Sequence, residues 1–430
     1  MDQRGDTIAA LSSGQPPAAV AIIRTSGPAA FAAAEALAGT LPPPRRALLR
    51  TLRDPGTGAA LDQALILRFD GPASATGEDI VEYQCHGGRA VVDALLGALT
   101  AMPGMRAAEP GEFTRRALAN GRIDLTEAEG LADLLEAETE SQRRAALRVA
   151  EGGLRRIVEG WRERLLLLSA RAEAEIDYVD DDDETAIDST RLAAESVTLA
   201  DELAGWLAKP RVEPLKTGVR VVVAGPPNAG KSSLVNALSQ SERAIVTPIE
   251  GTTRDVIEVP LAIGGVPFVL VDTAGLRDSI DQVERIGIAR AEFEADRADV
   301  LLWLGESAAS PPHARLIQLH LRADLPGREP ALEGTLPVSA VTGRGLTELT
   351  TLLIETARAL LPVDGDVALN RRQALEIAAA EDALRPANIA DIVIIADSLR
   401  RAREAFDRLT GRAGVDDMLD ALFGRFCLGK

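Results

Sequence analysis

Residues 225–236 read Gly-Pro-Pro-Asn-Ala-Gly-Lys-Ser-Ser-Leu-Val-Asn and follow the apolar run Val219–Ala224. They match the pattern G-x-x-x-x-G-K-[ST], a phosphate-binding loop between a strand and a helix. Backbone N–H groups of such a loop, together with the helix N-terminus, bind phosphate oxygens. Lys231 would neutralise the outer phosphates, which makes it a candidate catalytic residue, and the Ser232 hydroxyl would bind magnesium. The residues expected to bind nucleotide here are Asn228, Ala229, Gly230, Lys231, Ser232 and Ser233.

Further segments follow in the order of a nucleotide switch. Gly251-Thr252-Thr253-Arg254-Asp255 supplies a threonine, Thr253, that can reach magnesium and the γ-phosphate. Two strand-like runs, Val256–Ile263 and Pro267–Val271, are joined by Gly264-Gly265 and predict a hairpin. The second run leads into Asp272-Thr273-Ala274-Gly275, where the Asp can hold the metal's water shell and the Gly can donate its backbone N–H.

A later strand ends in Pro337-Val338-Ser339-Ala340, and the loop at Ser339 and Ala340 can offer backbone N–H groups to a guanine oxygen. Each short piece alone fits an ordinary turn or strand end. Their order and spacing together predict a Ras-like P-loop GTPase domain with a doubly wound sheet.

The base-reading loop departs from the usual Asn-Lys-x-Asp, since this chain has Leu321-Arg322-Ala323-Asp324. Asp324 keeps the carboxylate that accepts two hydrogen bonds from guanine, and the stem of Arg322 can cover the base face. Leu321 cannot replace the hydrogen bonds of the missing Asn. We therefore expect weaker discrimination of GTP from ATP than in most such domains.

The position that carries a water-orienting Gln in Ras is Leu276, and an apolar side chain cannot orient water. Another carboxylate must position the attacking water, and another cation must offset the charge of the transition state. Glu284 is the best nearby candidate for the carboxylate. On the residues alone, a solvated charge on a helix explains Glu284 equally well.

Composition restricts the function classes. The chain has 430 residues, 46% hydrophobic, and a formal net charge of −18, which argues against broad nonspecific RNA binding. No run approaches the roughly 18 apolar residues of a membrane span, and no signal-peptide pattern opens the chain. Its two cysteines, Cys85 and Cys427, fit no zinc or disulfide framework. We expect a cytoplasmic protein without a membrane partner.

The chain is predicted to be multidomain, with α/β and α+β parts. Residues 1–119 mix strand-like runs (18–24, 64–69 and 80–85) with helical patterns, which predicts an α+β domain. Residues 120–216 are mainly helical, with a capping-box signature at Thr126 and Glu129 and a break expected at Gly152-Gly153. Residues 217–365 form the nucleotide domain, and the helical pattern resumes in 366–430. The nucleotide domain is therefore predicted to be inserted into one helical domain.

Several further motifs, most of them outside the nucleotide domain, are together specific to one family. They are Asp6–Ala9, Thr76–Asp79, His86–Gly88, Ala108–Thr114, Asp272–Gly287 and the terminal Phe426-Cys427-Leu428-Gly429-Lys430. With these motifs the chain resembles, over essentially its whole length, the MnmE (TrmE) family of tRNA-modifying GTPases. The resemblance implies a folate-binding-like fold for residues 1–119, and a homodimer formed through it. For Cys427 it leaves open a chemical role or a packed thiol.

The resemblance also implies a reaction. Family members work with the FAD-dependent protein MnmG (GidA), which implies a heterotetramer here. The complex adds an aminomethyl or carboxymethylaminomethyl group to the wobble uridine of certain tRNAs. It uses a one-carbon unit from a 5-formyl- or 5,10-methylene-tetrahydrofolate derivative and requires GTP hydrolysis. The residues matching the family's folate contacts are Arg24, Glu82, Arg122 and Lys430. Cations suit the anionic glutamate tail of folate, and Glu82 suits the donor groups of the pterin.

Finally, the resemblance implies activation by potassium when two nucleotide domains dimerise. The K⁺ ligands would be Asn228, Thr247, the Ile249 carbonyl and Thr252, and Mg²⁺ would be held by Ser232 and Thr253. The nucleotide-contacting segment would comprise Thr247, Pro248, Ile249, Glu250, Gly251, Thr252 and Thr253. Glu284 matches the glutamate that orients water in the family.

Two other functions remain open on the sequence. An Era-like ribosome-assembly GTPase would share the Leu276 position and the potassium loop, but such proteins usually add a basic RNA-binding module, which this sequence does not show. A dimeric regulatory switch without a chemical product is the other. The folate-binding-like motifs argue against both.

Overall fold

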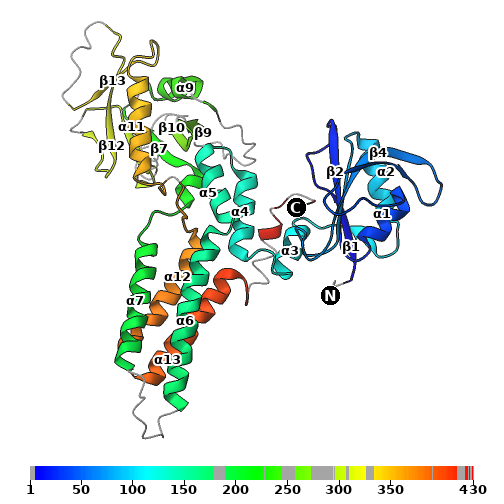
Figure 1. Cartoon of the computed structure of the whole chain (residues 1–430). Coiled ribbons are helices and arrows are strands. Elements are labelled where there is room, and N and C mark those ends of the chain that lie inside the picture. Colours follow the sequence, from blue (N-terminus) through cyan, green and yellow to red (C-terminus); the bar gives the residue numbers. More distant parts are fainter. Residues whose placement is uncertain are drawn as a thin grey trace, which may run out of the picture. The chain divides into compact units, whose positions relative to one another are not determined.

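The computed structural model describes residues 5–177, 189–226, 228–241, 243–244, 257–272, 294, 296–306, 309–325, 334–363, 365–389, 391–413, 422–424, 426 and 429. The chain divides into two compact units (Figure 1). The first comprises Met1–Ala132 and Asp407–Lys430, and the second comprises Asp133–Phe406.

The first unit is built on a mixed sheet with the strand order β3-β4-β5-β2-β1-β6. All neighbouring strands are antiparallel except β1 and β6, which are parallel. The strands are β1 Thr7–Leu11, β2 Val20–Ser26, β3 Leu48–Arg53, β4 Ala60–Phe69, β5 Ile80–His86 and β6 Met105–Ala107. Helices α1 (Ala30–Ala38) and α2 (Arg89–Thr100) pack their apolar residues against buried side chains of the sheet such as Ile23 and Tyr83.

The three strand-like runs predicted in this region are confirmed as β2, β4 and β5. β1, β3 and β6 were not predicted. β6 has only three residues, and β3 is an edge strand with exposed side chains, so neither shows a clear apolar alternation. The α+β expectation is confirmed.

Residues from the far end of the chain complete this unit. The Ser12 hydroxyl donates a hydrogen bond to the carbonyl oxygen of Gly429 at 2.9 Å. A Cβ added to Gly429, whose φ is +94°, would lie 2.1 Å from the carbonyl oxygen of Leu11. Gly111, with φ of +69°, also lies too close to its neighbour for a side chain, since an added Cβ would lie 2.6 Å from the Phe423 carbonyl oxygen. Glycine is therefore required at both positions.

The second unit contains a sheet with the order β13-β12-β11-β7-β10-β9-β8. β7, β10, β11, β12 and β13 are mutually parallel, while β9 is antiparallel to both β8 and β10. The strands are β7 Val219–Ala224, β8 Arg243–Ala244, β9 Ile257–Ile263, β10 Val266–Asp272, β11 Val300–Trp303, β12 Leu316–Leu321 and β13 Leu336–Val338. The predicted hairpin at Gly264-Gly265 is confirmed as β9–β10.

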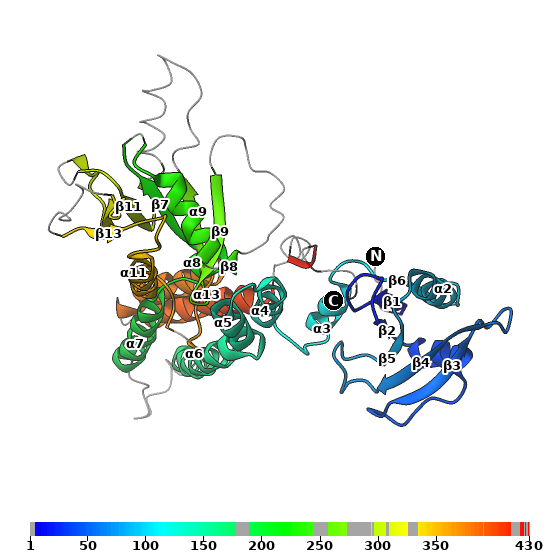
Figure 2. The same ribbon diagram turned by 90° about the horizontal axis from the view of Figure 1, so that it is seen from above.

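The parallel strands of this sheet are buried on both faces, as their continuous Val and Leu content requires. On one face Val221, Val223 and Leu270 pack in one cluster with Leu234 of α9 (Lys231–Ser241) and Leu349 of α11 (Leu346–Arg358). On the other face a smaller cluster includes Val222, Val271 and Leu301. The arrangement is the doubly wound α/β fold predicted from the sequence (Figure 2).

Long helices make up the rest of the second unit (Figure 1). The ring of Trp161 in α6 lies against Trp206 of α7 and Phe406 of α13, at centroid distances of 5.8 Å and 5.9 Å. The helices are α5 Glu140–Ala150, α6 Gly153–Asp177, α7 Ser189–Leu207, α8 Glu213–Thr217, α12 Arg371–Leu384, η3 Arg385–Ile389 and α13 Ile392–Thr410. Among the described residues, no helix combines the length and apolar character needed to cross a bilayer.

The helix boundaries confirm one prediction and correct another. The break at Gly152-Gly153 is present between α5 and α6. The capping box at the start of α4 (Leu125–Glu136) is Asp124 with Glu127, not Thr126 with Glu129 as predicted. Asp124 Oδ1 accepts from the Glu127 N–H, and Glu127 Oε2 accepts from the Asp124 N–H. Thr126 instead donates its hydroxyl hydrogen to Asp124.

Candidate functional site

The phosphate-binding pattern lies where the sequence predicts it, between β7 and α9. Asn228 and Gly230 have φ of +57° and +99°, so the loop turns through the left-handed region. Lys231 is almost fully buried, and its Nζ donates to the carbonyl oxygens of Gly225 at 2.9 Å and Pro226 at 3.0 Å. Ser232 and Ser233 are exposed in the first turn of α9. Ala229 packs against the core beneath the loop.

Among the described residues, four strands end at the same edge of the sheet. β10 ends in Asp272, and the segments after β7, β12 and β13 carry the phosphate-binding pattern, Asp324, and Ser339 with Ala340. Asp272 is 3% exposed, which suits a carboxylate that acts on a metal's water shell from within the fold. Ser339 is fully buried, and its Oγ accepts hydrogen bonds from the N–H groups of Val341 and Thr342, which fixes the turn after β13. Ligands of open α/β sheets bind at this edge.

The base-reading loop contacts the phosphate loop directly. Arg322, with φ of +61°, donates from Nη2 to the Asn228 carbonyl oxygen at 2.7 Å. Leu321 is buried, and its Cδ1 would lie 3.2 Å from a Cβ on Gly230. Asp324, three residues after Leu321, is exposed. Leu321 therefore packs as an apolar support for the phosphate loop.

The remaining predicted nucleotide and metal residues lie outside the described part of the chain. They are Thr247, Pro248, Ile249, Glu250, Gly251, Thr252, Thr253, Thr273, Ala274, Gly275 and Glu284. Lys430 and Cys427 also lie outside it.

Two of the predicted folate contacts form a pair in the first unit. Arg24 on β2 and Glu82 on β5 are opposite each other in the strand register. Arg24 donates from both Nε and Nη2 to Glu82 Oε1, at 3.0 Å and 2.7 Å. The guanidinium also lies 5.7 Å from the centroid of the Phe113 ring, a cation–π distance. Because Arg24 and Glu82 form an ion pair, a ligand would meet the two side chains together at one position of the sheet.

Arg122 is exposed and lies beside the loop that contains Thr76-Gly77. A Cβ on Gly77 would lie 3.2 Å from Arg122 Cγ and 3.0 Å from Asn120 Cβ, so only glycine lets the two segments approach. The Asn120 side chain donates to the Thr76 carbonyl oxygen at 2.7 Å. This loop therefore supports the position of Arg122.

An ionic network not predicted from the sequence joins three of the family-like motifs. Arg116 donates to Asp6 at 2.7 Å, to Glu112 at 3.0 Å and to Glu78 at 3.1 Å. Arg106 pairs with both Asp6 and Glu112. Each of the three motifs contains one of these carboxylates, which is the only sign of the network in the sequence. No periodic pattern indicates that the carboxylates lie close together in the fold.

The network perturbs the pKa of its members. Burial opposes ionisation of Glu112, but hydrogen bonds from Arg106, the Glu109 N–H and Arg116 outweigh it and lower the pKa below the ordinary 4.5. The pKa of Asp6 is likewise lowered, because hydrogen bonds from Arg106 and Arg116 outweigh burial. Both carboxylates are therefore held ionised at neutral pH.

Comparison with known proteins agrees with this arrangement. Residues 7–122 match the sequence profile of the "GTP-binding protein TrmE N-terminus", and residues 125–427 match that of the "MnmE helical domain". The chain belongs to the MnmE family. The "tRNA modification GTPase MnmE" of Novosphingobium aromaticivorans is 53% identical over 99% of this chain and 100% of its own length. The protein of the same name from Erythrobacter litoralis is 55% identical over the same shares.

Solved structures of other proteins match part of this chain. The G domain of the FeoB iron transporter of T. maritima is 26% identical, covering 32% of this chain and 98% of its own, with a TM-score of 0.24.

Proposed function

We propose that this chain is a GTP hydrolase that acts in the modification of tRNA. The observation that carries the proposal is the meeting of Lys231, Asp272, Asp324 and the Ser339 turn at one edge of a doubly wound sheet. Relatives more than half identical along their whole length are named tRNA modification GTPases, which supports the tRNA role.

The site residues would divide the work as follows. Backbone N–H groups of residues 228–233 and the Lys231 ammonium bind the phosphates, while Asp324 and the 339–340 turn bind guanine. Ser232 and Thr253 would hold Mg²⁺, which supplies charge neutralisation when bound, and the buried Asp272 would hold the metal's water shell. Gly251, Thr273, Ala274 and Gly275 belong to the segments beside the γ-phosphate, and Glu284 orients the attacking water.

Asn228, Thr247, the Ile249 carbonyl and Thr252 would hold K⁺, with Pro248 and Glu250 in the same loop. Bound there, the ion supplies the positive charge that an arginine finger supplies in other GTPases. The left-handed backbone at Asn228 supports this assignment, since it fixes the direction of that residue in the loop. Two copies of residues 217–365, inserted in the helical domain formed by 120–216 and 366–430, meet during hydrolysis.

Arg24, Glu82, Arg122 and Lys430 would hold a reduced folate, whose one-carbon unit enters the wobble uridine. Because Arg24 lies 2.7 Å from Glu82, we assign both to the pterin end of the ligand, and the anionic tail is left to Arg122 and Lys430 instead of Arg24. Arg24→Ala should weaken calorimetric binding of 5-formyltetrahydrofolate, by about tenfold if one charged hydrogen bond is lost. Unchanged affinity would contradict the assignment.

The protein would act in the cytoplasm as a homodimer through residues 1–119 and would form a heterotetramer with MnmG. Co-elution of the two proteins, with the mass measured by light scattering, tests the assembly. A chain that remains monomeric, or that never co-elutes with MnmG, would contradict it.

Nucleoside mass spectrometry of tRNA tests the main proposal. A strain that lacks the gene should lose the modified wobble uridine, and the plasmid-borne wild-type chain should restore it. Lys231→Ala should fail to restore it and should abolish GTP hydrolysis in vitro. Unaltered wobble uridines in the deletion strain would exclude the tRNA role, even if the chain hydrolyses GTP.

A further inference from the structure

Helix α5 is fastened to the hairpin of the nucleotide domain. Ser141, in its first turn, donates its hydroxyl hydrogen to the carbonyl oxygen of Gly265 at 2.7 Å. Gly265 lies in the turn between β9 and β10. The contact therefore reaches the end of the hairpin opposite to Asp272.

The same helix is fastened to both chain connections of the nucleotide domain. Gln142 Nε2 donates to the carbonyl oxygens of Leu215 at 3.0 Å and Lys216 at 3.3 Å, in the incoming helix α8. Arg148 Nε donates to the carbonyl oxygen of Gly365 at 3.0 Å, in the outgoing segment. Ala145 packs against the core cluster of the sheet. The spacing of these positions places them on one face of the helix.

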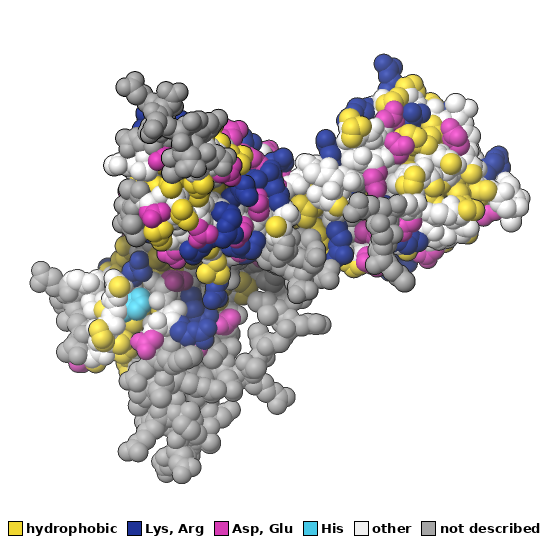
Figure 3. Space-filling view, turned by 90° about the horizontal axis from the view of Figure 1, so that it is seen from below, with side chains coloured by type: hydrophobic (Ala, Val, Ile, Leu, Met, Phe, Trp, Pro, Cys, Tyr) yellow, Lys and Arg dark blue, Asp and Glu magenta, His cyan; other side chains and the backbone are white. Residues whose placement is uncertain are grey.

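The incoming and outgoing segments are also joined to each other. The Val212 N–H donates to the Leu369 carbonyl oxygen at 3.1 Å, and the Arg371 N–H donates to Glu213 Oε1 at 2.5 Å. Figure 3 shows Lys and Arg side chains together with Asp and Glu side chains on one face of the molecule.

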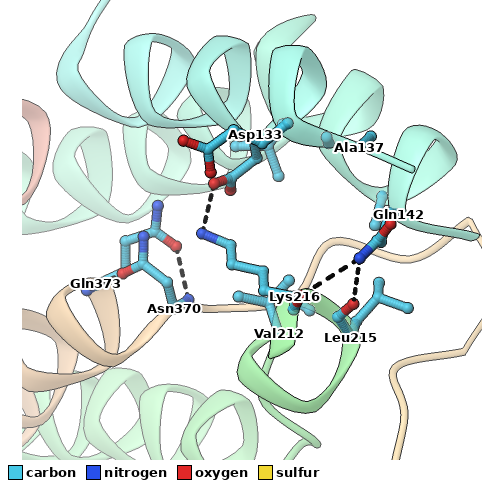
Figure 4. Close-up of a pocket in the computed structure, with 13 residues that line it drawn as sticks. Asp133, Ala137, Gln142, Val212, Leu215, Lys216, Asn370 and Gln373 are labelled. Carbon is cyan, nitrogen blue, oxygen red and sulfur yellow. Dashed lines mark hydrogen bonds and ion pairs between the residues drawn. The ribbon is translucent and has the colours of Figure 1, made fainter. Parts of the chain in front are cut away.

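A cavity of about 60 Å³ lies among α4, α5, α8 and the start of α12. Lys216 extends across it, with Nζ 2.6 Å from Asp133 Oδ1 (Figure 4). Its lining includes the small side chains Ala137, Ala145 and Ala146. Close-packed interiors resist displacement, so a void at this point leaves room for α8 to shift against α5.

We propose that α5 transmits movement of the β9–β10 hairpin to the helices of the second unit. The hairpin is a rigid lever, because its ladder pairs every residue from Val266↔Ile263 to Asp272↔Ile257. Asp272 lies at the sheet edge that carries the phosphate loop, so nucleotide binding there would displace Asp272 and, through the paired strands, Gly265. The hydrogen bond from Ser141 to Gly265 would then pass the movement to α5. The inference depends on the proposed function only in requiring that nucleotide binds at the phosphate loop.

Gln142 allows a sharp test because the two ends of its amide do different work. Its Oε1 accepts from the N–H groups of Thr139 at 2.8 Å and Glu138 at 2.9 Å, completing the capping box of α5. Its Nε2 makes the contacts with α8. Gln142→Glu keeps the acceptor and the helix cap but removes the donor. Ser141→Ala removes the hydrogen bond to Gly265 and a longer hydroxyl contact with Thr139 Oγ1 at 3.4 Å, and it leaves Gln142 unchanged.

Hydrogen–deuterium exchange of the full-length chain, with and without the nonhydrolysable analogue GDPNP, measures the transmission. In the wild type, amides of residues 140–150 should exchange at different rates in the two states, by up to about tenfold for one hydrogen bond. In the Ser141→Ala/Gln142→Glu variant this difference should fall below about twofold, while that of residues 257–272 persists. Arg143→Gln, an exposed change on the same helix, should leave both differences intact.

A double variant that keeps the full difference in 140–150 would overturn the transmission role while leaving the proposed function standing. Failure of the wild-type chain to bind GDPNP would overturn both. Circular dichroism checks the fold of the double variant. Should the double variant unfold, Ser141→Ala alone must still reduce the difference, and a wild-type response from it would overturn the inference.

Discussion

Arg322 Nη2 donates a hydrogen bond to the carbonyl oxygen of Asn228 at 2.7 Å, so the base-reading loop is fastened directly to the phosphate loop. Both residues have positive φ, of +61° and +57°. Leu321 adds an apolar contact at Gly230. The base-reading loop therefore contacts the phosphate loop through Arg322 and Leu321, although Leu321, which stands in place of the usual Asn, cannot form a hydrogen bond to guanine.

Leu321→Asn should increase the preference for GTP over ATP. A restored neutral hydrogen bond is worth about 0.5–1.5 kcal/mol, or up to about tenfold in affinity. Competition between the two nucleotides measures the ratio. Leu325→Asn, at an exposed position in the same loop, should leave it unchanged. A wild-type chain that already excludes ATP as strongly as an Asn-Lys-x-Asp protein would contradict the expectation.

GTP hydrolysis should be faster in potassium than in sodium, by about tenfold or more, since a fixed cation replaces part of the 10³–10⁵ that an arginine finger provides. Steady-state rates at equal ionic strength measure the effect. Asn228→Ala should remove most of the difference. Equal wild-type rates in the two salts would refute the potassium site.

Glu284→Ala should slow hydrolysis by about 100-fold or more, the usual contribution of a positioned acid or base. Affinity for GTP, measured with a fluorescent analogue, should be retained because the role proposed for Glu284 is to orient the attacking water and not to bind the nucleotide. Lys231→Ala provides the contrast, since it should lose affinity itself. Loss of binding in Glu284→Ala would indicate a structural role.

Acid should destabilise the first unit through its ionic network. The lowered pKa values of Asp6 and Glu112 mean that the unfolded chain takes up these protons more readily than the folded chain. Their stabilisation is therefore complete above about 4.5, the ordinary pKa of Glu112, and is lost as pH falls through the lowered values. Glu112→Gln should cost about 3 kcal/mol at pH 7 and reduce this pH dependence.

Hydrogen–deuterium exchange of the full-length chain in urea, read on peptides from residues 5–132, measures that stability. Glu109→Gln replaces an exposed carboxylate beside the network and should behave as the wild type. If Glu112→Gln and the wild type lose stability in parallel between pH 7 and pH 3, the network does not cause the acid sensitivity.

The sequence predicted those features that depend on residues close together in the chain. The phosphate loop, the Gly264-Gly265 hairpin and the helix break at Gly152 are all local patterns, and each is confirmed. The break before α5 was not predicted, although the Thr139–Gln142 capping box is a local signal for it. The predicted position of the α4 cap was wrong because Asp124 caps the helix two residues earlier, accepting from the Glu127 N–H, and the Thr126 hydroxyl donates to Asp124.

Contacts between distant segments could not be predicted in this way. Arg116 bonds to Asp6, 110 positions away in the sequence, and to Glu78, 38 positions away, and Ser141 bonds to Gly265, 124 positions away. The Arg24–Glu82 pairing depends on the register of β2 and β5, which no motif fixes. The motifs thus identified which residues matter, and the sheets determined which of them meet.

The hydrogen bond between Ser12 and Gly429 joins residues 417 positions apart. During synthesis on the ribosome, the first strands of the sheet emerge long before this partner exists, so the unit that begins first is completed last. A tag fused after Gly429 would slow the formation of this last contact, whereas a tag placed before the first strand would not.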